Sequence, residues 1–523
     1  MYKRQNLLYL NTSIFTSSLQ EYSAPGISLG NNAALHGMPL PRLNQIPSTI
    51  SFVTDSFSAD IINPVFLKGG VVKISPYTLG LSIGIGSGRG DLVLSAEFFN
   101  DARSIFSTPN TSVIIGGNKA GDIYINETIT LSNSTSIISG GNITISENGS
   151  ILNLGRDSTL ILDSARNFKN QNGSTAISNL GDNSRWIIYS KNPDKDQFNG
   201  LVSGAIAYWG ANSQSLSAAA IFGNAYVFSM VGEITVSTVN DTKLYGQTST
   251  ANSISSDYVI TGAAINASSY GGVFMNTPTS QIWVGTLDVT SIGTSARANV
   301  VGGPYIIEAS GLMALPGFSI NYVNSGLLTI TPATVSLSAI KTYDGNINLT
   351  GTQVTITTGI AGQTLTYSGA TSNSPNVSTA SYINAITLGD CSGVGCKGAA
   401  SNYQLPSLTA ASANNAVTIN RATVGLSASK NYDGNINLTG TQVTITTSIT
   451  GESLTYTSAT STSANVAASN KYINAITLGD CSGVDCKGAA SNYQLPALNR
   501  SNAPVTITPA TVSLSAIKTY DGN

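Results

Sequence analysis

One stretch of this chain is written twice. Residues 341–358 read KTYDGNINLTGTQVTITT, and residues 430–447 repeat them with a single change, from Thr342 to Asn431. The repeat returns after about 90 residues, which is longer than one rung of a solenoid and matches one small sandwich domain. A third copy begins at Lys518. The chain is therefore predicted to fold as a string of modules, each with its own set of strands.

Each repeat predicts half-buried β-strands. Ile347 and Leu349 alternate with Asn and Thr residues, and Val354 and Ile356 alternate with polar residues in the same way. Successive side chains of a strand point to opposite faces, so one face of each strand is apolar and the other carries hydroxyl and amide groups. Asp344-Gly345 stands before the first alternating run and predicts a type I′ turn, in which both residues have positive φ.

The composition fits such strands and excludes other classes of protein. Hydrophobic residues make up 41% of the 523 residues, whereas disordered chains contain few of them. Charged residues are only 10%, and the net charge of -2 argues against a nucleic-acid partner, because neutralising phosphates needs clusters of Lys and Arg. The most apolar stretch, residues 218–231, is shorter than a membrane-spanning helix and is interrupted by Gly223 and Asn224.

Residues 112–162 follow a different pattern. Short apolar segments such as DIYIN, TITL, SIIS, ITIS, ILNL and LILD recur between Gly, Asn and Ser residues. Each segment is too short for a helix and alternates with a period of two, and such close, even spacing is typical of a β-solenoid. A meandering sheet is the alternative. The predicted fold class is all-β, with a right-handed β-solenoid body followed by tandem β-sandwich-like repeat modules.

A divergent relative of the repeats precedes them. DTKLYG at residues 241–246 opens it. FSINYVNSGLLTITPAT at residues 318–334 closes it with an Asn-Tyr pair and a final strand, as SNYQLP and a final strand close each repeat. The tandem array is therefore predicted to begin at Gly232.

The block that follows the solenoid has a distinctive sequence. RWIIYSKNPDKDQFNGLVSG occupies residues 185–204, and GNAYVFS occupies residues 223–229. This block is similar to the segment that ends the β-helical body of bacterial filamentous haemagglutinin-like exoproteins. The KLYG … NYVNSGLLTIT module resembles the MBG domain, and the repeats resemble the YDG domain; both domains are often strung together in such proteins. The resemblance covers residues 112–523.

The resemblance implies a secreted or cell-surface bacterial adhesin, associated with the outer membrane. Such proteins are often exported by a two-partner system through an outer-membrane β-barrel, and the adhesive partner would be a glycan or protein on a host or neighbouring cell. The family's secretion domain should carry an Asn-Pro-Asn motif, to which Asn63-Pro64 in IINPVF is the nearest counterpart. A purely structural spacer of another surface protein is the alternative function, and a polysaccharide-degrading β-helix enzyme is the third.

The repeat and motif boundaries predict seven segments in a chain that we expect to be a fragment of a longer protein. They are an amino-terminal β-type region at 1–111, the solenoid at 112–174, a terminating segment at 175–231, the MBG-like module at 232–332, YDG repeats at 333–420 and 421–508, and a truncated third repeat at 509–523.

The four cysteines fall in equivalent loops of the two repeats, as CSGVGC (Cys391, Cys396) and CSGVDC (Cys481, Cys486). A local disulfide in each loop is the simplest interpretation and fits an oxidising compartment. Free thiols and a shared zinc ion are the alternatives. A module of about 90 residues has a radius of gyration of about 12 Å, so equivalent loops should lie too far apart to share an ion. We expect no metal or cofactor.

Three further motifs have both a functional and a structural interpretation. Arg89-Gly90-Asp91 is the tripeptide that integrins recognise, but in a Gly-rich stretch its glycine also reads as a turn residue. Asp344 and Asp433 in the YDG turns could bind calcium, although no second carboxylate is spaced to complete a site. Tyr343 and Tyr432 are predicted to pack in the core or at an edge.

The carboxylates of the solenoid argue against an enzyme. Polysaccharide-cleaving chemistry needs paired carboxylates, or a metal ion with a basic residue. The acidic residues here are scattered and do not stack from one turn to the next: Asp122, Glu127, Glu147, Asp157 and Asp163. We therefore expect the chain to have no enzymatic activity.

Overall fold

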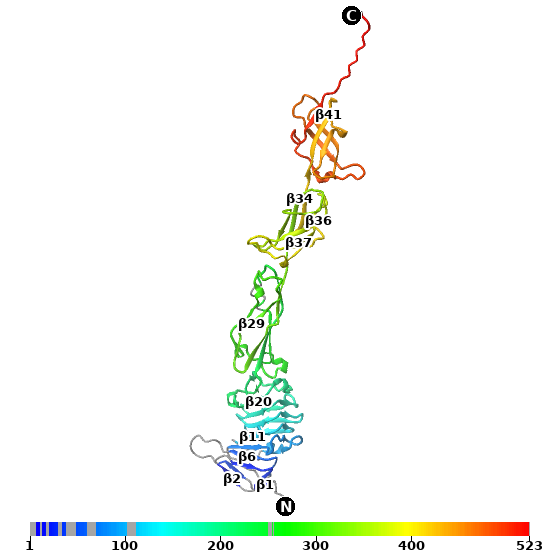
Figure 1. Cartoon of the computed structure of the whole chain (residues 1–523). Coiled ribbons are helices and arrows are strands. Elements are labelled where there is room, and N and C mark those ends of the chain that lie inside the picture. The colour runs from blue at the N-terminus through cyan, green and yellow to red at the C-terminus, as the bar shows by residue number, and fades with distance from the viewer. Residues whose placement is uncertain are drawn as a thin grey trace, which may run out of the picture. The chain divides into compact units, whose positions relative to one another are not determined.

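The computed structural model of the chain describes residues 7–10, 13–16, 20–29, 34–37, 49–59, 70–101, 111–248, 254 and 256–521. Asn63-Pro64 lies outside these residues. The regular structure is almost entirely β (Figure 1), with one short α-helix, α1 (Glu97–Asn100), in the described part. The predicted all-β fold is confirmed. The chain forms two compact units, the first containing residues 1–239, 254–290 and 307–326, and the second the remainder.

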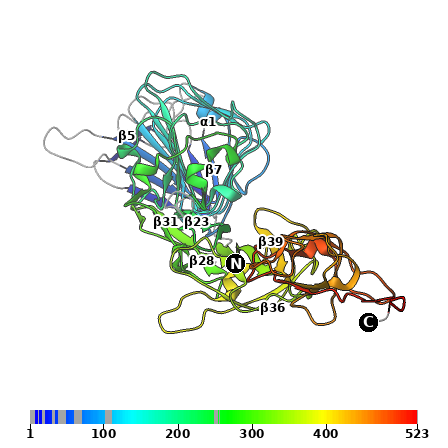
Figure 2. The same ribbon diagram turned by 90° about the horizontal axis from the view of Figure 1, so that it is seen from above.

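The first unit contains a β-solenoid in which each turn supplies one strand to each of three parallel sheets. Between residues 111 and 179, each strand pairs in parallel with the equivalent strand of the next turn, three places later in the chain, and Figure 2 looks along this stack. Three successive turns are β11 (Thr111–Gly117), β12 (Ile123–Ile125), β13 (Thr128–Leu131); β14 (Thr135–Ser139), β15 (Ile143–Ile145), β16 (Ser150–Asn153); and β17 (Thr159–Ser164), β18 (Phe168–Asn170), β19 (Ile177–Asn179).

Aliphatic side chains stack in register inside the solenoid. In the largest sheet, Ile74, Ile115, Ile137, Leu162 and Ile188 are aligned as pairing partners, and each is fully buried. Parallel pairing without a shift places equivalent side chains directly above one another, and alternation along each strand turns every second side chain inward. The recurring apolar segments of the sequence are therefore the inner faces of the turns.

The solenoid begins earlier than the predicted boundary at residue 112. Within the described residues its largest sheet has nine strands, and three of them precede β11: β3 (Gln20–Ser23), β6 (Thr49–Val53) and β8 (Gly70–Ser75). The apolar segments in this region are separated by longer intervening stretches, so the even spacing that reveals the later turns is missing. The other strands here are β1 (Leu7–Leu10), β2 (Ser13–Thr16), β4 (Gly26–Leu29), β5 (Ala34–Gly37), β7 (Ser56–Ala59), β9 (Ile83–Ile85) and β10 (Leu92–Leu94).

The solenoid also continues past residue 174, into the block that was predicted to terminate it. β20 (Arg185–Ser190), β22 (Ala225–Phe228) and β21 (Tyr208–Trp209) complete the nine-stranded sheet. Aromatic side chains gather at this end. Tyr226 meets Trp186 edge-on with ring centroids 5.1 Å apart, and Phe198 edge-on at 4.9 Å, while Phe274 packs 5.7 Å from Phe228. These rings cover apolar interior that the last turn would otherwise expose.

One half-buried carboxyl group lies near this aromatic cap. Asp196 accepts hydrogen bonds from the Phe168 N–H at 2.8 Å and from the Ser190 hydroxyl at 2.5 Å. Burial raises the pKa of Asp196 to about 7, against the two hydrogen bonds, which lower it. Its backbone partner belongs to the preceding turn, so Asp196 ties the cap to the body of the solenoid.

The predicted MBG-like module at 232–332 is not one compact body. β23 (Gly232–Thr238) pairs with β25 (Tyr258–Gly262) and β31 (Phe318–Val323) in the first unit, where Phe274 reaches the aromatic cap. β24 (Asp241–Leu244) pairs with β32 (Leu327–Thr331), and β32 with β28 (Tyr305–Ile306), in the second unit. Sequence similarity to the repeats therefore did not indicate which core each segment joins. The remaining strands are β26 (Trp283–Val284), β27 (Asp288–Thr290), β29 (Glu308–Ser310) and β30 (Met313–Ala314).

The two YDG repeats have the same strand pattern. Repeat 1 contains β33 (Ala333–Thr334), β34 (Ser336–Thr342), β35 (Val354–Thr357), β36 (Thr366–Ser372), β37 (Ile383–Gly389), β38 (Tyr403–Gln404) and β39 (Asn415–Asn420). Repeat 2 contains β40 (Ala422–Thr423), β41 (Gly425–Asn431), β42 (Val443–Thr446), β43 (Thr455–Ser461), β44 (Ile473–Gly479), β45 (Tyr493–Gln494) and β46 (Val505–Thr508). In each repeat the first long strand is central, antiparallel to one neighbour and parallel to the last strand.

The parallel pairing of first and last strands places the two ends of a repeat at opposite poles. β34 and β39 run in the same direction, so the chain enters repeat 1 at one pole and leaves at the other. Only Arg421 separates β39 from β40, which belongs to repeat 2. This topology suits joining in series, because each repeat ends where the next begins.

Short 3-10 helices occur in the connections, at Pro193–Lys195, Ala218–Ala220, Ala263–Ile265, Ala267–Tyr270, Thr279–Gln281, Ile292–Thr294, Ala400–Asn402, Gly440–Gln442 and Ala490–Asn492. Within the described ranges, no helix has the length and apolar character needed to cross a membrane.

Candidate functional site

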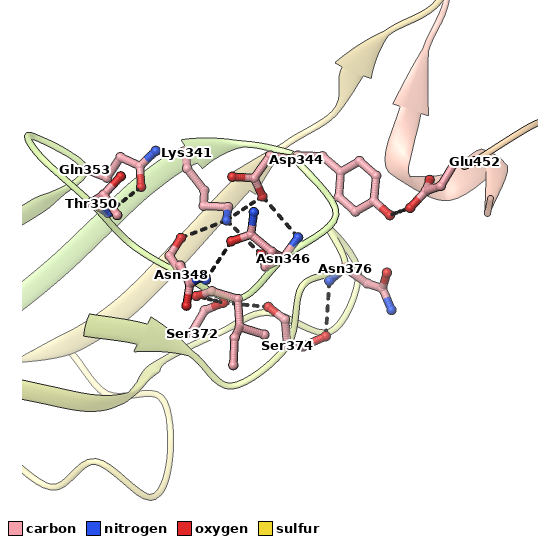
Figure 3. A network of polar contacts seen from close by, with 12 residues as sticks. Lys341, Asp344, Asn346, Asn348, Thr350, Gln353, Ser372, Ser374, Asn376 and Glu452 are labelled. Atoms are coloured by element: carbon pink, nitrogen blue, oxygen red, sulfur yellow. Dashed lines mark hydrogen bonds and ion pairs between the residues drawn. The ribbon is translucent and has the colours of Figure 1, made fainter. Parts of the chain in front are cut away.

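A buried lysine organises the YDG turn of repeat 1. Lys341 lies near the end of β34, and its side chain has no exposed surface. Its ammonium group donates to the backbone oxygens of Asn346 at 2.7 Å and Asn348 at 3.0 Å, and lies 2.6 Å from Asp344 Oδ1 (Figure 3). Three donors thus meet three oxygen atoms, one of them charged, which satisfies an ammonium group removed from water.

Side-chain to backbone hydrogen bonds fix the rest of this turn. Asp344 Oδ1 accepts the Asn346 N–H at 3.2 Å, and Asn346 Oδ1 accepts the Asn348 N–H at 2.8 Å. Gly345 has φ of 78°, whereas Asp344 does not have positive φ. The predicted type I′ turn is therefore wrong, because the aspartate caps the backbone two residues ahead and leaves only the glycine in the left-handed region.

Repeat 2 reproduces the same arrangement. Lys430, also fully buried, donates to the oxygens of Asn435 at 3.1 Å and Asn437 at 2.8 Å, and lies 2.7 Å from Asp433 Oδ1. The hydrogen bond to Lys430 is the main cause that lowers the pKa of Asp433. The motif is therefore better described as K-x-Y-D-G-N-x-N, since each of its polar residues takes part in the turn.

In the KLYG sequence of the divergent module, the lysine has no aspartate partner, and backbone oxygens take that place. Lys243 donates instead to the backbone oxygens of Gln247, Thr294 and Ser295. Three neutral carbonyl groups thus surround this ammonium group, and burial lowers the pKa of Lys243. The lysine is shared by all three turns, while the aspartate belongs only to the two repeats.

The tyrosine of the turn contacts the following repeat. The ring of Tyr343 lies edge-on to that of Tyr493, with centroids 5.4 Å apart and an interplanar angle of 77°. Both hydroxyl groups donate to Glu452, Tyr343 to Oε1 and Tyr493 to Oε2, each at 2.6 Å. Burial, reinforced by the Glu452 carboxylate, raises the pKa of Tyr343 to about 12. The two phenols and the carboxylate form a closed bridge between repeats, which we call the joint.

Two further contacts complete the joint. Asn492 of repeat 2 accepts the Val377 N–H at 2.9 Å and donates to Asn376 Oδ1 at 2.9 Å, so one amide side chain satisfies two groups of repeat 1. A Cβ atom on Gly345 would lie 3.0 Å from the Ile449 side chain. The glycine therefore serves both the left-handed backbone and the close approach of the next repeat.

The same joint links the divergent module to repeat 1. Tyr245 lies edge-on to Tyr403 at 5.4 Å, and Gln363 bonds to both hydroxyl groups. Asn402 accepts the Val300 N–H at 2.8 Å and donates to Asn299 Oδ1 at 2.9 Å. Only the bridging residue differs between the joints, glutamine in one and glutamate in the other.

One sequence motif contains the residues that each following repeat contributes to a joint. The motif SNYQLP occurs in both repeats at the same place, and its Asn and Tyr are Asn402 and Tyr403, then Asn492 and Tyr493. The strand pattern assigns them to the end of a module, but which module they face depends on tertiary packing.

The calcium interpretation of the YDG aspartates is replaced by the lysine contacts described above. Within the described ranges, no group of three or more His, Cys, Asp or Glu side chains is placed to hold a metal ion.

The structure places a disulfide in each cysteine loop. Cys391 is joined to Cys396 and Cys481 to Cys486, with Cα atoms 5.8 and 5.7 Å apart. The loops between them are exposed, and Val394 at the tip of the first has its whole side chain in solvent. Each bridge closes a surface loop within its own repeat and takes no part in the joint.

Both charged residues of the Arg89-Gly90-Asp91 tripeptide have partners inside the solenoid. The guanidinium group of Arg89 lies over the Tyr124 ring, 4.2 Å from its centroid. Asp91 Oδ2 accepts the Ser82 hydroxyl at 2.5 Å. A Cβ atom on Gly90 would lie 2.1 Å from the backbone nitrogen of Gly84, so this glycine is required for close packing. Both charged residues are exposed, and each of them contacts a neighbouring residue of the solenoid.

The solenoid carboxylates have separate partners. Asp122 accepts from Asn142, Glu127 from Ser87, Asp157 from Asn183 and Asp163 from Ser213, while the backbone oxygen of Glu147 accepts from Asn172. These contacts fix the turns of the solenoid, one carboxylate at a time.

A groove of about 460 Å³ lies on one side of the solenoid. Asp122 is the single carboxylate among the residues that line it, together with Lys119, Arg166 and Tyr124. Burial opposes ionisation of Asp122, but hydrogen bonds from Asn142 and Tyr124 outweigh burial and lower its pKa. The groove therefore offers hydrogen-bonding groups without a pair of carboxylates for acid–base chemistry.

Comparisons of the chain with protein-family models, with curated proteins and with solved structures found no match. The resemblance to filamentous haemagglutinin-like exoproteins therefore stays a hypothesis that rests on the sequence motifs.

The first prediction concerns the buried lysine. Asp344→Asn removes the charged partner of Lys341 and should lower the free energy of unfolding of repeat 1 by about 2 kcal/mol, the scale of a hydrogen bond to a charged group. The matched control is Asp521→Asn: Lys518 and Asp521 form the same pair at 3.1 Å, but both side chains are about 60% exposed, so the change should be less than about 0.5 kcal/mol. Hydrogen exchange of the β34 and β39 peptides measures the stability of repeat 1 in both variants. Equal effects at the two sites would show that the buried ion pair does not stabilise the repeat.

The second prediction concerns the disulfides. Protein recovered from an oxidising compartment should give Cys391–Cys396 and Cys481–Cys486 peptides on non-reducing mapping, and alkylation should label the four cysteines only after reduction. Closing so small a ring should contribute about 2 kcal/mol per repeat. Alkylation without reduction, or zinc that copurifies with the protein, would reject the pairing.

Proposed function

We propose that this chain is part of a secreted or cell-surface bacterial adhesin in which the YDG repeats supply reach and do not themselves bind. The observation that carries this proposal is the topology of a repeat, whose parallel first and last strands place its ends at opposite poles. A module of this kind extends a chain each time it is added. Each added module contacts the preceding one through the same kind of joint.

The outer face of repeat 2 supports an inert role. Along β41 and β46 the burial alternates strictly, and the exposed positions are small or polar: Gly425, Ser427, Ser429, Asn431, Thr506 and Thr508. Hydroxyl and amide groups stay hydrated and uncharged at all physiological pH values, so they keep a surface soluble without attracting charged partners. The same property favours the alternative function, a spacer in another surface protein.

Adhesion is then assigned to the solenoid or to a part of the parent protein beyond this sequence. The groove beside Asp122 is the candidate surface on the solenoid, because its charged, hydroxyl and amide groups suit a hydrated glycan. The enzyme interpretation ranks below both, since that groove has one carboxylate where glycoside hydrolysis uses two.

The third prediction is a binding series with chains ending at Thr331, Asn420 and Thr508, which carry no, one and two repeats. These ends keep the cap residue Phe274 and the β24–β32 pair intact. Binding to cells and to an immobilised glycan panel should have the same affinity in all three chains, because near-identical repeats that bound would add avidity with each copy.

Three outcomes of this series are distinct. Equal, measurable binding supports an adhesin with inert repeats, and its loss on Arg166→Ala would place the contact in the groove. Binding that climbs with repeat number contradicts the inert role. No binding by any of the chains supports the spacer.

A further inference from the structure

Repeat 2 contains a third copy of the tyrosine half of the joint, and no following repeat covers this copy in the described residues. Tyr432 occupies the position of Tyr245 and Tyr343, but its exposed fraction is 42%, against 4% and 6% for those two. A Cβ atom on Gly434 would meet nothing within 4 Å, whereas one on Gly246 or Gly345 would meet an isoleucine of the next repeat. We call the surface formed by Tyr432, Gly434, Asn465 and Val466 the open joint face.

The open joint face is already organised without a partner. Lys430 makes the same three contacts as Lys341, and Gly434 has φ of 79° compared with 78° for Gly345. Asn465 and Val466 hold the positions of Asn376 and Val377, which receive the asparagine side chain in the formed joint. Docking would therefore require little reordering of repeat 2, which favours binding.

The formed joints specify what the partner must present. The face opposite each tyrosine contains an isoleucine, a glutamine or glutamate, and an Asn-Tyr pair: Ile360, Gln363, Asn402 and Tyr403 in repeat 1, and Ile449, Glu452, Asn492 and Tyr493 in repeat 2. Both faces are already occupied, by Tyr245 and by Tyr343. A second copy of this chain consequently offers no free face of this kind in its described part.

The segment that follows β46 in the chain has the sequence of the start of a repeat. Residues 510–523 are identical in sequence to residues 333–346, which form β33, β34 and the turn of repeat 1. In repeat 1, Val335 and Leu337 of this segment are 0% and 2% exposed, whereas the equivalent Val512 and Leu514 are 76% and 92% exposed. Residues 509–521 contain no strand. These apolar side chains match the interior of a repeat that would lie directly against Tyr432.

We propose that the open joint face is a docking surface for one further YDG-type repeat, built on residues 510–523, whose Asn-Tyr pair and bridging Gln or Glu close on Tyr432. The surface is selective by chemistry: a partner must bring an acceptor between two phenols and an amide side chain that both accepts and donates. The inference rests on the two formed joints and is independent of whether the protein is an adhesin.

The test compares this chain with a longer one in which a copy of residues 347–420 follows Asn523, so that 510–523 becomes the start of a second repeat 1. Both chains are treated with tetranitromethane, and nitration of Tyr432 is followed by peptide mass spectrometry, with Tyr343 as the buried internal standard. Docking should slow nitration of Tyr432 roughly sevenfold, the ratio of the 42% and 6% exposed fractions. A second long chain with Ile360→Asp in the added copy places a charge against Gly434 and should restore the fast rate.

The folded state of the added copy is followed by its own disulfide and by hydrogen exchange. A folded copy with Tyr432 nitrated as fast as in the original chain overturns the proposal. An added copy that stays unfolded also overturns it, because the same residues fold in repeat 1 when they face Tyr245 through an identical joint. Slow nitration that Ile360→Asp does not reverse shows that the protection comes from elsewhere and likewise contradicts docking at this face.

Discussion

A buried ammonium group with three oxygen partners holds the turn that follows the first long strand of each repeat. An unpaired charge in this position would cost several kcal/mol, so the turn closes only where an acceptor set surrounds the lysine. Tyr343 and Gly345 lie next to Asp344 in the chain, and their placement follows from that closure. The face through which one repeat contacts the next is therefore built on the lysine, although the lysine does not touch the next repeat.

The joints explain how near-identical modules can be added in series. Each uses a tyrosine pair, one bridging Gln or Glu, and an asparagine that satisfies a backbone N–H of the preceding module. Because both repeats contain both halves of this interface, another copy needs no new contact. This suits the proposed role in supplying reach, since duplication changes the number of modules and leaves every joint as it was.

Residue patterns predicted the all-β fold and the solenoid turns after residue 112, because those depend on local alternation of apolar residues. They failed where packing between distant segments decides. β3, β6 and β8 belong to the solenoid although their spacing is uneven, and Phe274 joins the cap from within a module that resembles the repeats. The predicted type I′ turn at Asp344 was wrong because its geometry is set by a lysine three residues earlier and not by the Asp-Gly pair alone. Glu452 and Asn492 form hydrogen bonds to residues of the preceding repeat, and a local residue pattern cannot indicate such a contact.

The central claim is that the YDG motif and the Asn-Tyr pair form a joint that is closed in solution. Hydrogen exchange of single backbone amides tests it within one molecule, because Val300 and Val377 donate to Asn402 and Asn492 across the two joints, while the equivalent Val466 lies on the open face. We expect slow exchange at Val300 and Val377 and fast exchange at Val466. The Asn492→Ala variant should lose the slow exchange at Val377. Exchange at Val377 as fast as at Val466 would contradict it.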